Sequence, residues 1–146
     1  MTDDLSELLH DTGEAGVYGL SLPIDMLGAA ARRGELLYVE IDVAEVYDGQ
    51  ELVAALATAL AIPQWPGGDW EVLEDYLMDL SWIDAPGVVI ALTDCDSLMS
   101  EEPEDFAAAL EIFTDTAAFW HESGQPFWVF VGCTDPGDFE LPLLGA

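Results

Sequence analysis

Lysine is missing from this chain of 146 residues, and Arg32 and Arg33 are its only fixed positive charges. Asp and Glu together number 30, which sets the formal net charge at −28. Proteins bind nucleic acids largely by neutralising phosphates with Lys and Arg, so the composition excludes nucleic-acid binding of that kind. Anionic membranes are excluded for the same reason. A basic protein partner, mimicry of nucleic acid, and acidity that serves solubility at high salt remain as interpretations.

The sequence also lacks an apolar stretch of about 18 residues, the length from which a membrane-spanning helix is read. Its N-terminus has no basic segment followed by an apolar run and a small-residue cleavage site. We therefore expect a cytoplasmic protein. Hydrophobic residues nevertheless make up 51% of the 146 residues, which is enough for the core of one domain.

The chain has only two cysteines, Cys95 and Cys133, and two histidines, His10 and His121. Each cysteine follows an apolar run, and parallel strands could bring the two thiols near each other. Reduced, packed thiols are the expected state. Neither histidine has a Ser or Cys partner in an elbow-like motif, and no Gly-rich phosphate loop is present. The sequence predicts a protein that is not an enzyme and that uses no cofactor or metal.

Asp94 and Asp96 follow an apolar run, where an aspartate-nucleophile phosphatase places its acidic pair. Such an enzyme needs cations to hold phosphate, normally including a Lys, and this chain contains none. As a calcium loop with Glu101 and Glu102, the segment lacks the central Gly and the ligand spacing. We interpret the two aspartates as a cap or turn at the end of a strand.

Residues 63–82 form the most informative segment. A turn rich in Pro and Gly leads into a short helix for which Asp69 is the expected N-cap. Apolar residues at steps of three and four should face inward, namely Trp70, Leu73, Leu77 and Leu80. The acids left on the outer face are Glu71, Glu74, Asp75 and Asp79. No Lys or Arg stands four residues from any of them, so this face repels itself and suits a cationic partner.

Strands and helices alternate along the rest of the chain. Strands are expected at 17–20, 37–43, 87–92 and 127–131, and helices at 25–33, 48–61 and from Pro103 onward. Apolar and polar residues alternate over 37–43, which is the pattern of a half-buried strand. Apolar residues at steps of three and four should form the inner faces of the last two helices, namely Leu52, Leu56 and Leu60 in one and Phe106, Leu110, Phe113, Ala117 and Trp120 in the other. Gly34 is the expected C′ residue of the first helix, and Asp48 with Glu51 forms a capping box for the second. This order predicts the α/β class, as a single compact layered domain with a small, mainly parallel sheet of about three to four strands packed by helices.

The acidic helix segment resembles the signature of the barstar family, small intracellular inhibitors of secreted ribonucleases. The residues that carry this resemblance are Pro63, Trp65, Gly67, Trp70, Glu71, Leu73, Asp75 and Leu77, with Glu71 in place of the Asp of the family. The order of elements from about residue 35 to 131 follows the layout of the family, and the first third of the chain resembles an extension of longer members. Departures from the family pattern occur at Asp69, Glu71, Val72, Glu74, Tyr76 and Met78.

The resemblance implies an inhibitor of the immunity or antitoxin type that blocks the cationic active site of a basic ribonuclease or ribonuclease-like toxin domain. It implies that Asp75 enters the phosphate-binding site and that Trp65 makes apolar contact at the rim. The predicted partner-binding residues are Trp65, Glu71, Glu74, Asp75, Met78, Asp79 and, on the long helix, Asp115.

The resemblance also implies an N-terminal extension over residues 1–34 packed on the domain, a barstar-like domain over 35–133 and a C-terminal tail over 134–146. Two alternatives to the inhibitor remain at this point. One is a nucleic-acid-mimicking acidic protein that sequesters a basic nucleic-acid-binding partner. The other is a barstar-like scaffold kept for an unrelated role in a salt-adapted proteome, since fold alone does not determine function.

Overall fold

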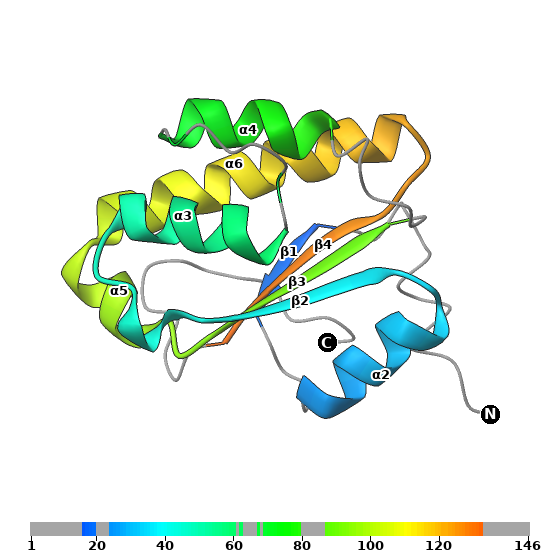
Figure 1. The fold of residues 1–146 in the computed structure, drawn as a ribbon, viewed down its shortest axis with the longest axis horizontal. Helices are drawn as coiled ribbons and strands as arrows, with labels where there is room; N and C mark the ends of the chain where they lie inside the picture. Colours follow the sequence, from blue (N-terminus) through cyan, green and yellow to red (C-terminus); the bar gives the residue numbers. More distant parts are fainter. Residues whose placement is uncertain are drawn as a thin grey trace.

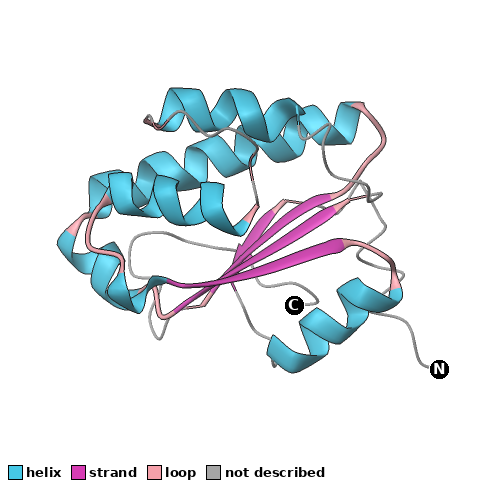
Figure 2. Cartoon of the chain, in the orientation of Figure 1, coloured by secondary structure: helices cyan, strands magenta, loops and turns pink. Residues whose placement is uncertain are grey.

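A computed structural model describes residues 16–19, 24–60, 62, 67, 69–79 and 87–132. Helices lie on both faces of a central sheet: α2 covers one face, and α3, α4 and α6 cover the other (Figures 1 and 2). This arrangement confirms the predicted α/β class and layered architecture. The elements in chain order are β1 (Val17–Gly19), α2 (Ile24–Arg33), β2 (Leu37–Asp42), the 3-10 helix η1 (Val43–Glu45), α3 (Gly49–Ala59), α4 (Trp70–Asp79), β3 (Val88–Thr93), α5 (Asp96–Glu101), α6 (Pro103–Glu122) and β4 (Phe127–Val131).

The described strands form one all-parallel sheet of four strands in the order β1-β4-β3-β2. The central strands β3 and β4 are buried along their length except at Thr93, as expected where helices cover both faces of a parallel sheet. In β2, by contrast, Val39 and Ile41 are buried while Glu40 and Asp42 are exposed. That alternation confirms the predicted half-buried strand, which ends where Val43 enters η1.

The larger part of the core lies between the sheet and α3, α4 and α6. Side chains of the predicted stripe on α6 take part in it: Phe106, Phe113, Ala117 and Trp120 are buried, and Leu110 packs against them. Leu52 and Leu56 of α3 are fully buried in the same cluster. The three-and-four spacing of apolar residues therefore identified the inward faces of α3 and α6.

A second, smaller cluster lies on the opposite face, between α2 and alternate residues of β3 and β4. Trp128 is its centre: its ring centroid lies 5.6 Å from that of Tyr18 and 5.8 Å from that of Phe130. The small residues Ala30 and Ala31 let α2 approach these rings. Because neighbouring residues of a strand point to opposite faces, β4 supplies both cores at once.

Both arginines belong to the last turn of α2, where cations suit the helix dipole. The Arg32 guanidinium carbon lies 5.6 Å from the centroid of the Tyr38 ring. Tyr38 in turn donates a hydrogen bond to Glu40 Oε1 at 3.1 Å. Burial, followed by the Glu40 carboxylate, raises the pKa of Tyr38 to about 12. The phenol therefore keeps its proton at neutral pH and can donate it to Glu40.

The end of α2 differs from the prediction. The left-handed residue is Glu35, at φ 63°, while Gly34 is the C-cap. Leu36 N donates to Ala31 O at 2.9 Å and Glu35 N to Arg32 O at 3.0 Å, the pair of bonds that defines a Schellman motif. The predicted C′ position at Gly34 is therefore wrong by one residue. The backbone hydrogen bonds of the motif place C′ at Glu35, although glycine is the residue usually found there.

Two carboxylates from different parts of the chain hold the start of α3. Asp48 Oδ1 accepts from Glu51 N at 2.9 Å, as the predicted capping box requires, whereas Glu51 reaches Tyr47 N and not Asp48 N. Asp105 of α6 accepts from Gly49 N at 2.9 Å. A Cβ on Gly49 would lie 2.9 Å from Asp105 Cγ, so only glycine allows this approach. The described helix ends at Ala59, short of the predicted Ala61, which itself lies outside the described residues.

Helix α5 directly follows β3 and was not predicted. Asp94, at φ 56°, makes the turn out of the strand, and both Asp94 and Asp96 are exposed. Cys95 is buried between them, and its backbone N donates to Gly132 O at 3.0 Å. The other cysteine, Cys133, lies outside the described residues, so the distance between the two thiols stays open. No helix in the described part is long and apolar enough to span a membrane.

Candidate functional site

Asp69 determines where α4 begins. Its Oδ1 accepts from Glu71 N at 3.1 Å and Val72 N at 3.4 Å, and its carbonyl oxygen accepts from Leu73 N at 3.1 Å. These bonds satisfy N–H groups that have no partner inside the helix. The prediction of Asp69 as the N-cap is therefore confirmed, and the cap determines which side chains of α4 face outward.

Helix α4 is held against α6 by apolar packing and by one buried hydrogen bond (Figure 1). Leu73 and Leu77 are fully buried, and Trp70 is half-buried against the same core. Trp120 of α6 donates from Nε1 to Leu77 O at 3.0 Å. This carbonyl belongs to the last turn of α4, where no intrahelical donor is available. The bond therefore orients the end of α4 relative to α6.

The acids of α4 do not all have the same environment. Glu71 and Asp75 are exposed, as predicted. Glu74, predicted to face solvent, is half-buried and lies beside α6. Asp79 is the last residue of α4, and its side chain lies outside the described part. Glu74 is thus the acid whose surroundings depend on a second helix.

Four other carboxylates surround Glu74. Burial raises the pKa of Glu74, and the neighbouring carboxylates of Asp115, Asp75, Glu111 and Glu71 raise it further. Asp115 and Glu111 are both exposed residues of α6 and lie one turn apart. The fold therefore brings Asp115, predicted as a partner-binding residue of the long helix, near the acids of α4. We call this set the acidic surface: Glu71, Glu74, Asp75, Glu111 and Asp115.

Glu111 was missed by the sequence reading. It stands four residues before Asp115, so the two share one face of α6, and this spacing was the available signal. Met78 is half-buried. Trp65 and Leu80 lie outside the described residues, so the predicted contact at the rim stays a prediction.

No Lys or Arg offsets the acidic surface on its own side of the sheet. Arg32 and Arg33 are the only Lys or Arg residues of the chain, and both belong to α2 on the opposite face (Figure 1). In the described part, no group of three or more His, Cys, Asp or Glu side chains is arranged to hold a metal ion.

The family model for barstar, described as the barnase inhibitor, matches residues 36–132. The chain belongs to the barstar family. No match to a curated protein was found. The family region begins one residue before β2 and ends one residue after β4, so it includes α4 and α6.

The barstar-family region contains every residue of the acidic surface and every predicted partner-binding residue. Strand β1 and helix α2 lie outside it, so they add an edge strand and the cover of one sheet face to the family region. The description of the family is that of an inhibitor and not of an enzyme.

Proposed function

We propose that this protein inhibits a basic ribonuclease, or a toxin domain of that kind, by covering its cationic active site with the acidic surface. The observation that carries the proposal is the meeting of α4 and α6, which gathers carboxylates on a side of the sheet without Lys or Arg, in a chain of a barnase-inhibitor family. An RNA-cleaving enzyme holds phosphates with cationic groups. Carboxylates in a preorganised array can occupy the same positions.

Asp75 is the central residue of this proposal. It is exposed in the middle of α4, between Glu71 one turn before and the last residue Asp79 one turn after. Its carboxylate enters the phosphate-binding site of the nuclease, while Glu71 and Glu74 flank it and Asp115 makes a second contact from α6. Trp65, Met78 and Asp79 complete the proposed interface.

Repulsion among the carboxylates destabilises the free protein, and a cationic partner would relieve it, which favours this function. Like charges one turn apart on a helix destabilise it by a few tenths of a kcal/mol per pair. Burial is the first cause of the raised pKa of Glu74, and the same repulsion within the acidic surface raises it further. A cationic cleft would remove the repulsion and replace it with attraction, so the arrangement is unfavourable alone and favourable in the complex.

The decisive experiment compares Asp75→Ala with Asp25→Ala, measuring the inhibition constant against a barnase-type ribonuclease. Both side chains are exposed helical aspartates, but Asp25 belongs to α2 on the opposite face of the sheet. We expect Asp75→Ala to weaken inhibition by at least about 2 kcal/mol, the threshold of an interface hot spot, and Asp25→Ala to have little effect. Equal inhibition by the two variants would refute the assignment of Asp75.

Salt dependence tests the wider claim that charge drives the encounter. The association rate should fall steeply between low salt and about 0.5 M, and the dissociation rate should change less. An association rate that ignores salt would indicate an apolar interface instead.

We further propose that the protein has no hydrolytic activity of its own and acts in the cytoplasm as an immunity protein. Asp94 and Asp96 are exposed at the turn into α5, and the chain has no Lys to hold a phosphate beside them. RNA and phosphate esters should therefore remain intact with magnesium or manganese present. Turnover that Asp94→Asn abolishes would overturn this statement.

A further inference from the structure

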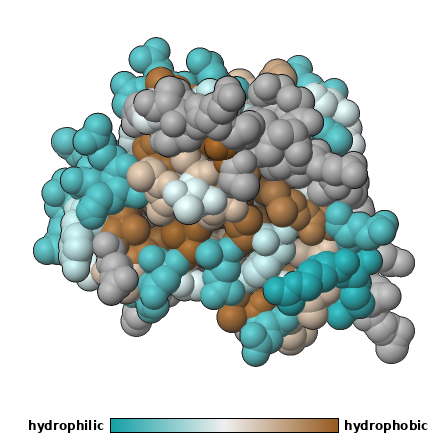
Figure 3. Space-filling model, viewed as in Figure 1, coloured by the Kyte–Doolittle hydropathy of each residue, from teal (hydrophilic) through white to brown (hydrophobic). Residues whose placement is uncertain are grey.

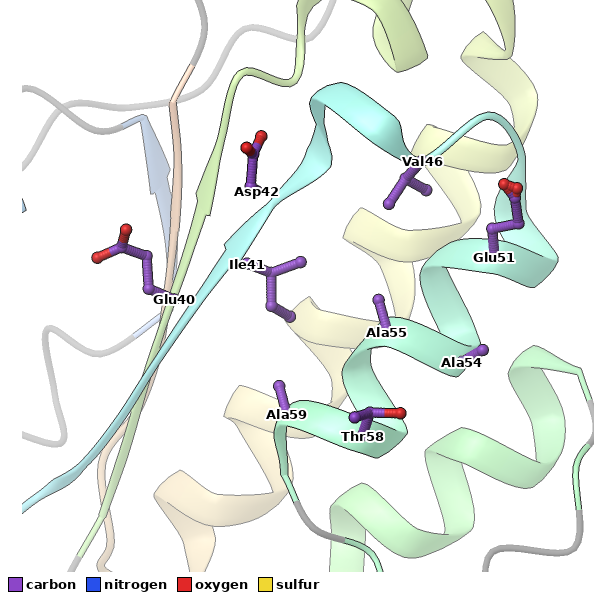
Figure 4. Close-up of a pocket in the computed structure, with 9 residues that line it drawn as sticks. All are labelled: Glu40, Ile41, Asp42, Val46, Glu51, Ala54, Ala55, Thr58 and Ala59. Atoms are coloured by element: carbon purple, nitrogen blue, oxygen red, sulfur yellow. The ribbon is translucent and has the colours of Figure 1, made fainter.

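A groove of about 570 Å³ lies between strand β2 and helix α3, away from the acidic surface. Part of its lining is apolar: Ile41 points from β2 toward α3, and Ala55 and Ala59 of α3 face the strand (Figure 4). Polar and acidic residues complete the lining, namely Glu40, Asp42, Glu51 and Thr58. In the space-filling view, apolar side chains between α3 and β2 are bordered by hydrophilic ones (Figure 3). The small side chains on α3 leave this space open.

Strand β2 is an edge of the sheet among the described strands. Leu37 N donates to Gly87 O, and Leu37 pairs with Val88, so the backbone groups of Leu37, Val39 and Ile41 point toward β3. In a parallel ladder the intervening residues direct their N–H and C=O groups to the other side. The backbone groups of Glu40 and Asp42 therefore face the open edge, directly beside the groove.

Acidic and apolar side chains alternate along this edge. Glu40 and Asp42 are exposed and point away from α3, while Ile41 between them points into the groove (Figure 4). Tyr47, which follows the groove residue Val46 in the chain, is 69% exposed. An exposed aromatic ring next to carboxylates attracts cations and packs against apolar groups.

We propose that this edge binds an extended cationic segment of another protein, which pairs with β2 as an added strand. Such β-addition takes its affinity from backbone hydrogen bonds and its specificity from alternate side chains. Here apolar side chains of the added strand enter the groove, and Arg or Lys side chains on its other face pair with Glu40 and Asp42. The edge thus recognises a segment in which basic and apolar residues alternate.

The occupant comes from another protein because this chain has nothing of that composition. Its two basic residues are both in α2, and the segments 1–15 and 133–146 contain acids without any Lys or Arg. A second copy would bring another formal charge of −28. Exposed acids on an edge strand also disfavour pairing between identical edges. The same charges that repel a copy attract a basic strand.

This proposal is independent of the inhibitory function. The groove is lined by residues of β2, α3 and the turn between them, and none of these belongs to the acidic surface. Each surface can therefore be tested in the absence of the other's partner.

The first test uses a fluorescein-labelled peptide, Gly-Arg-Val-Arg-Val-Arg-Gly, and measures its binding to the intact protein by fluorescence anisotropy. In a strand that pairs with β2, every second N–H points toward β2. Two methylated versions of the peptide each block one set of backbone N–H groups. One carries methyl groups on the backbone nitrogens of Val and the other on the backbone nitrogens of Arg, and both keep the charge and the side chains of the parent peptide. We expect one version to lose at least about tenfold in affinity and the other to bind nearly as the parent. Equal binding by both would mean non-specific attraction and would overturn the proposal.

Matched variants of the protein test the charge and the groove separately. Glu40→Lys with Asp42→Asn removes the paired acids but keeps an N-cap for η1, since Asp42 Oδ1 accepts from Ala44 N. Its control, Glu101→Lys with Glu122→Gln, changes the net charge equally at exposed sites of α5 and α6. Ala55→Leu fills the groove, with Ala118→Leu at an exposed site of α6 as its control. At about 0.15 M salt both edge variants should bind the peptide at least about tenfold more weakly than their controls.

Amide hydrogen exchange identifies the bonds directly. The Glu40 and Asp42 amides should exchange at least about tenfold more slowly when the peptide is bound, and the Val39 and Ile41 amides, already directed to β3, should change little. Peptide binding without slower exchange at Glu40 and Asp42 would place the peptide elsewhere and overturn the proposal.

Discussion

The two faces of the sheet differ in what covers them and in the size of the core beneath. On one face a single helix, α2, packs its small residues on the aromatic rings of Tyr18, Trp128 and Phe130, and it carries both arginines. On the other face α3, α4 and α6 form the larger core, and their outer surfaces are acidic without any Lys or Arg. The α2 side therefore holds the chain's only Lys or Arg residues, whereas the surface formed by α4 and α6 presents carboxylates without either.

This division shows how one small domain can separate folding from binding. Strands β3 and β4 contribute alternate side chains to both cores. Truncating a buried side chain on either face should therefore lower the free energy of unfolding by a similar amount. Only the face that positions α4 relative to α6 should change inhibition. The predictions below test that asymmetry.

The largest effect is expected from truncating one fully buried leucine on each face. Leu27 of α2 and Leu77 of α4 both have 0% exposure, so Leu27→Ala and Leu77→Ala should each lower the free energy of unfolding by about 2 to 5 kcal/mol. Urea unfolding measures this loss, and nuclease inhibition by the folded fraction measures function. Only Leu77→Ala should weaken inhibition, because Leu77 seats the acidic helix. Equal inhibition constants for the two variants would contradict the claim that only the face with α4 and α6 serves inhibition.

A smaller effect is expected from the hydrogen bond between the two acidic helices. Trp120→Phe keeps an aromatic ring near Phe127, whose centroid lies 5.5 Å from that of Trp120, but leaves Leu77 O without its donor. A buried acceptor without a partner costs about 1 to 3 kcal/mol. We expect a loss of that size in urea unfolding, together with faster amide exchange in the last turn of α4. Phe127→Leu, which alters packing but keeps the bond, should leave that exchange unchanged relative to the rest of the helix.

On the α2 face, backbone strain offers a gain in stability that should leave inhibition untouched. Glu35 is exposed at φ 63°, a conformation that costs a residue with a Cβ about 1 to 2 kcal/mol. After the entropic cost of glycine, Glu35→Gly should stabilise the protein by about 0.5 to 1 kcal/mol. The thermal midpoint should therefore rise for Glu35→Gly. A lower midpoint for Glu35→Gly together with a clear loss for Gly34→Ala would place the left-handed conformation at Gly34 instead.

The smallest effect concerns the charge at the centre of the acidic surface. Because the folded state raises the pKa of Glu74, the folded protein holds this proton more tightly than the unfolded chain. The stability that Glu74 contributes is present below its ordinary pKa and is lost as pH rises through the raised value. Glu74→Gln should therefore stabilise the protein at neutral pH by a few tenths of a kcal/mol and flatten this part of the pH profile.

Glu71→Gln is the matched control for that measurement. Glu71 lies in the first turn of α4, where the helix dipole favours a negative charge. Its removal should give no gain in the urea midpoint at neutral pH. A gain as large as that of Glu74→Gln would show that general repulsion, and not the position beside α6, determines the cost of Glu74.

Local patterns predicted most of the fold. Continuous apolar runs identified β3 and β4, and spacing of three and four identified the inner faces of α3, α4 and α6, because burial on one or two faces imposes these periods directly. The cap at Asp69 was predictable since it depends on atoms two or three residues away. Helix α5 was missed because its N-cap residue, Cys95, makes no side-chain cap bond, so the sequence carries no start signal.

The chain's composition and signature by themselves determined an acidic α/β domain of the barstar family, because charge, periodicity and short-range caps are properties of neighbouring residues. Tertiary structure alone decided that Asp115 and Glu111 meet Glu74, that Trp120 holds the end of α4, and that β2 has an open edge beside a groove. These features depend on which elements pack together. Packing joins residues far apart in sequence, and their side-chain types alone do not specify which pairs will meet.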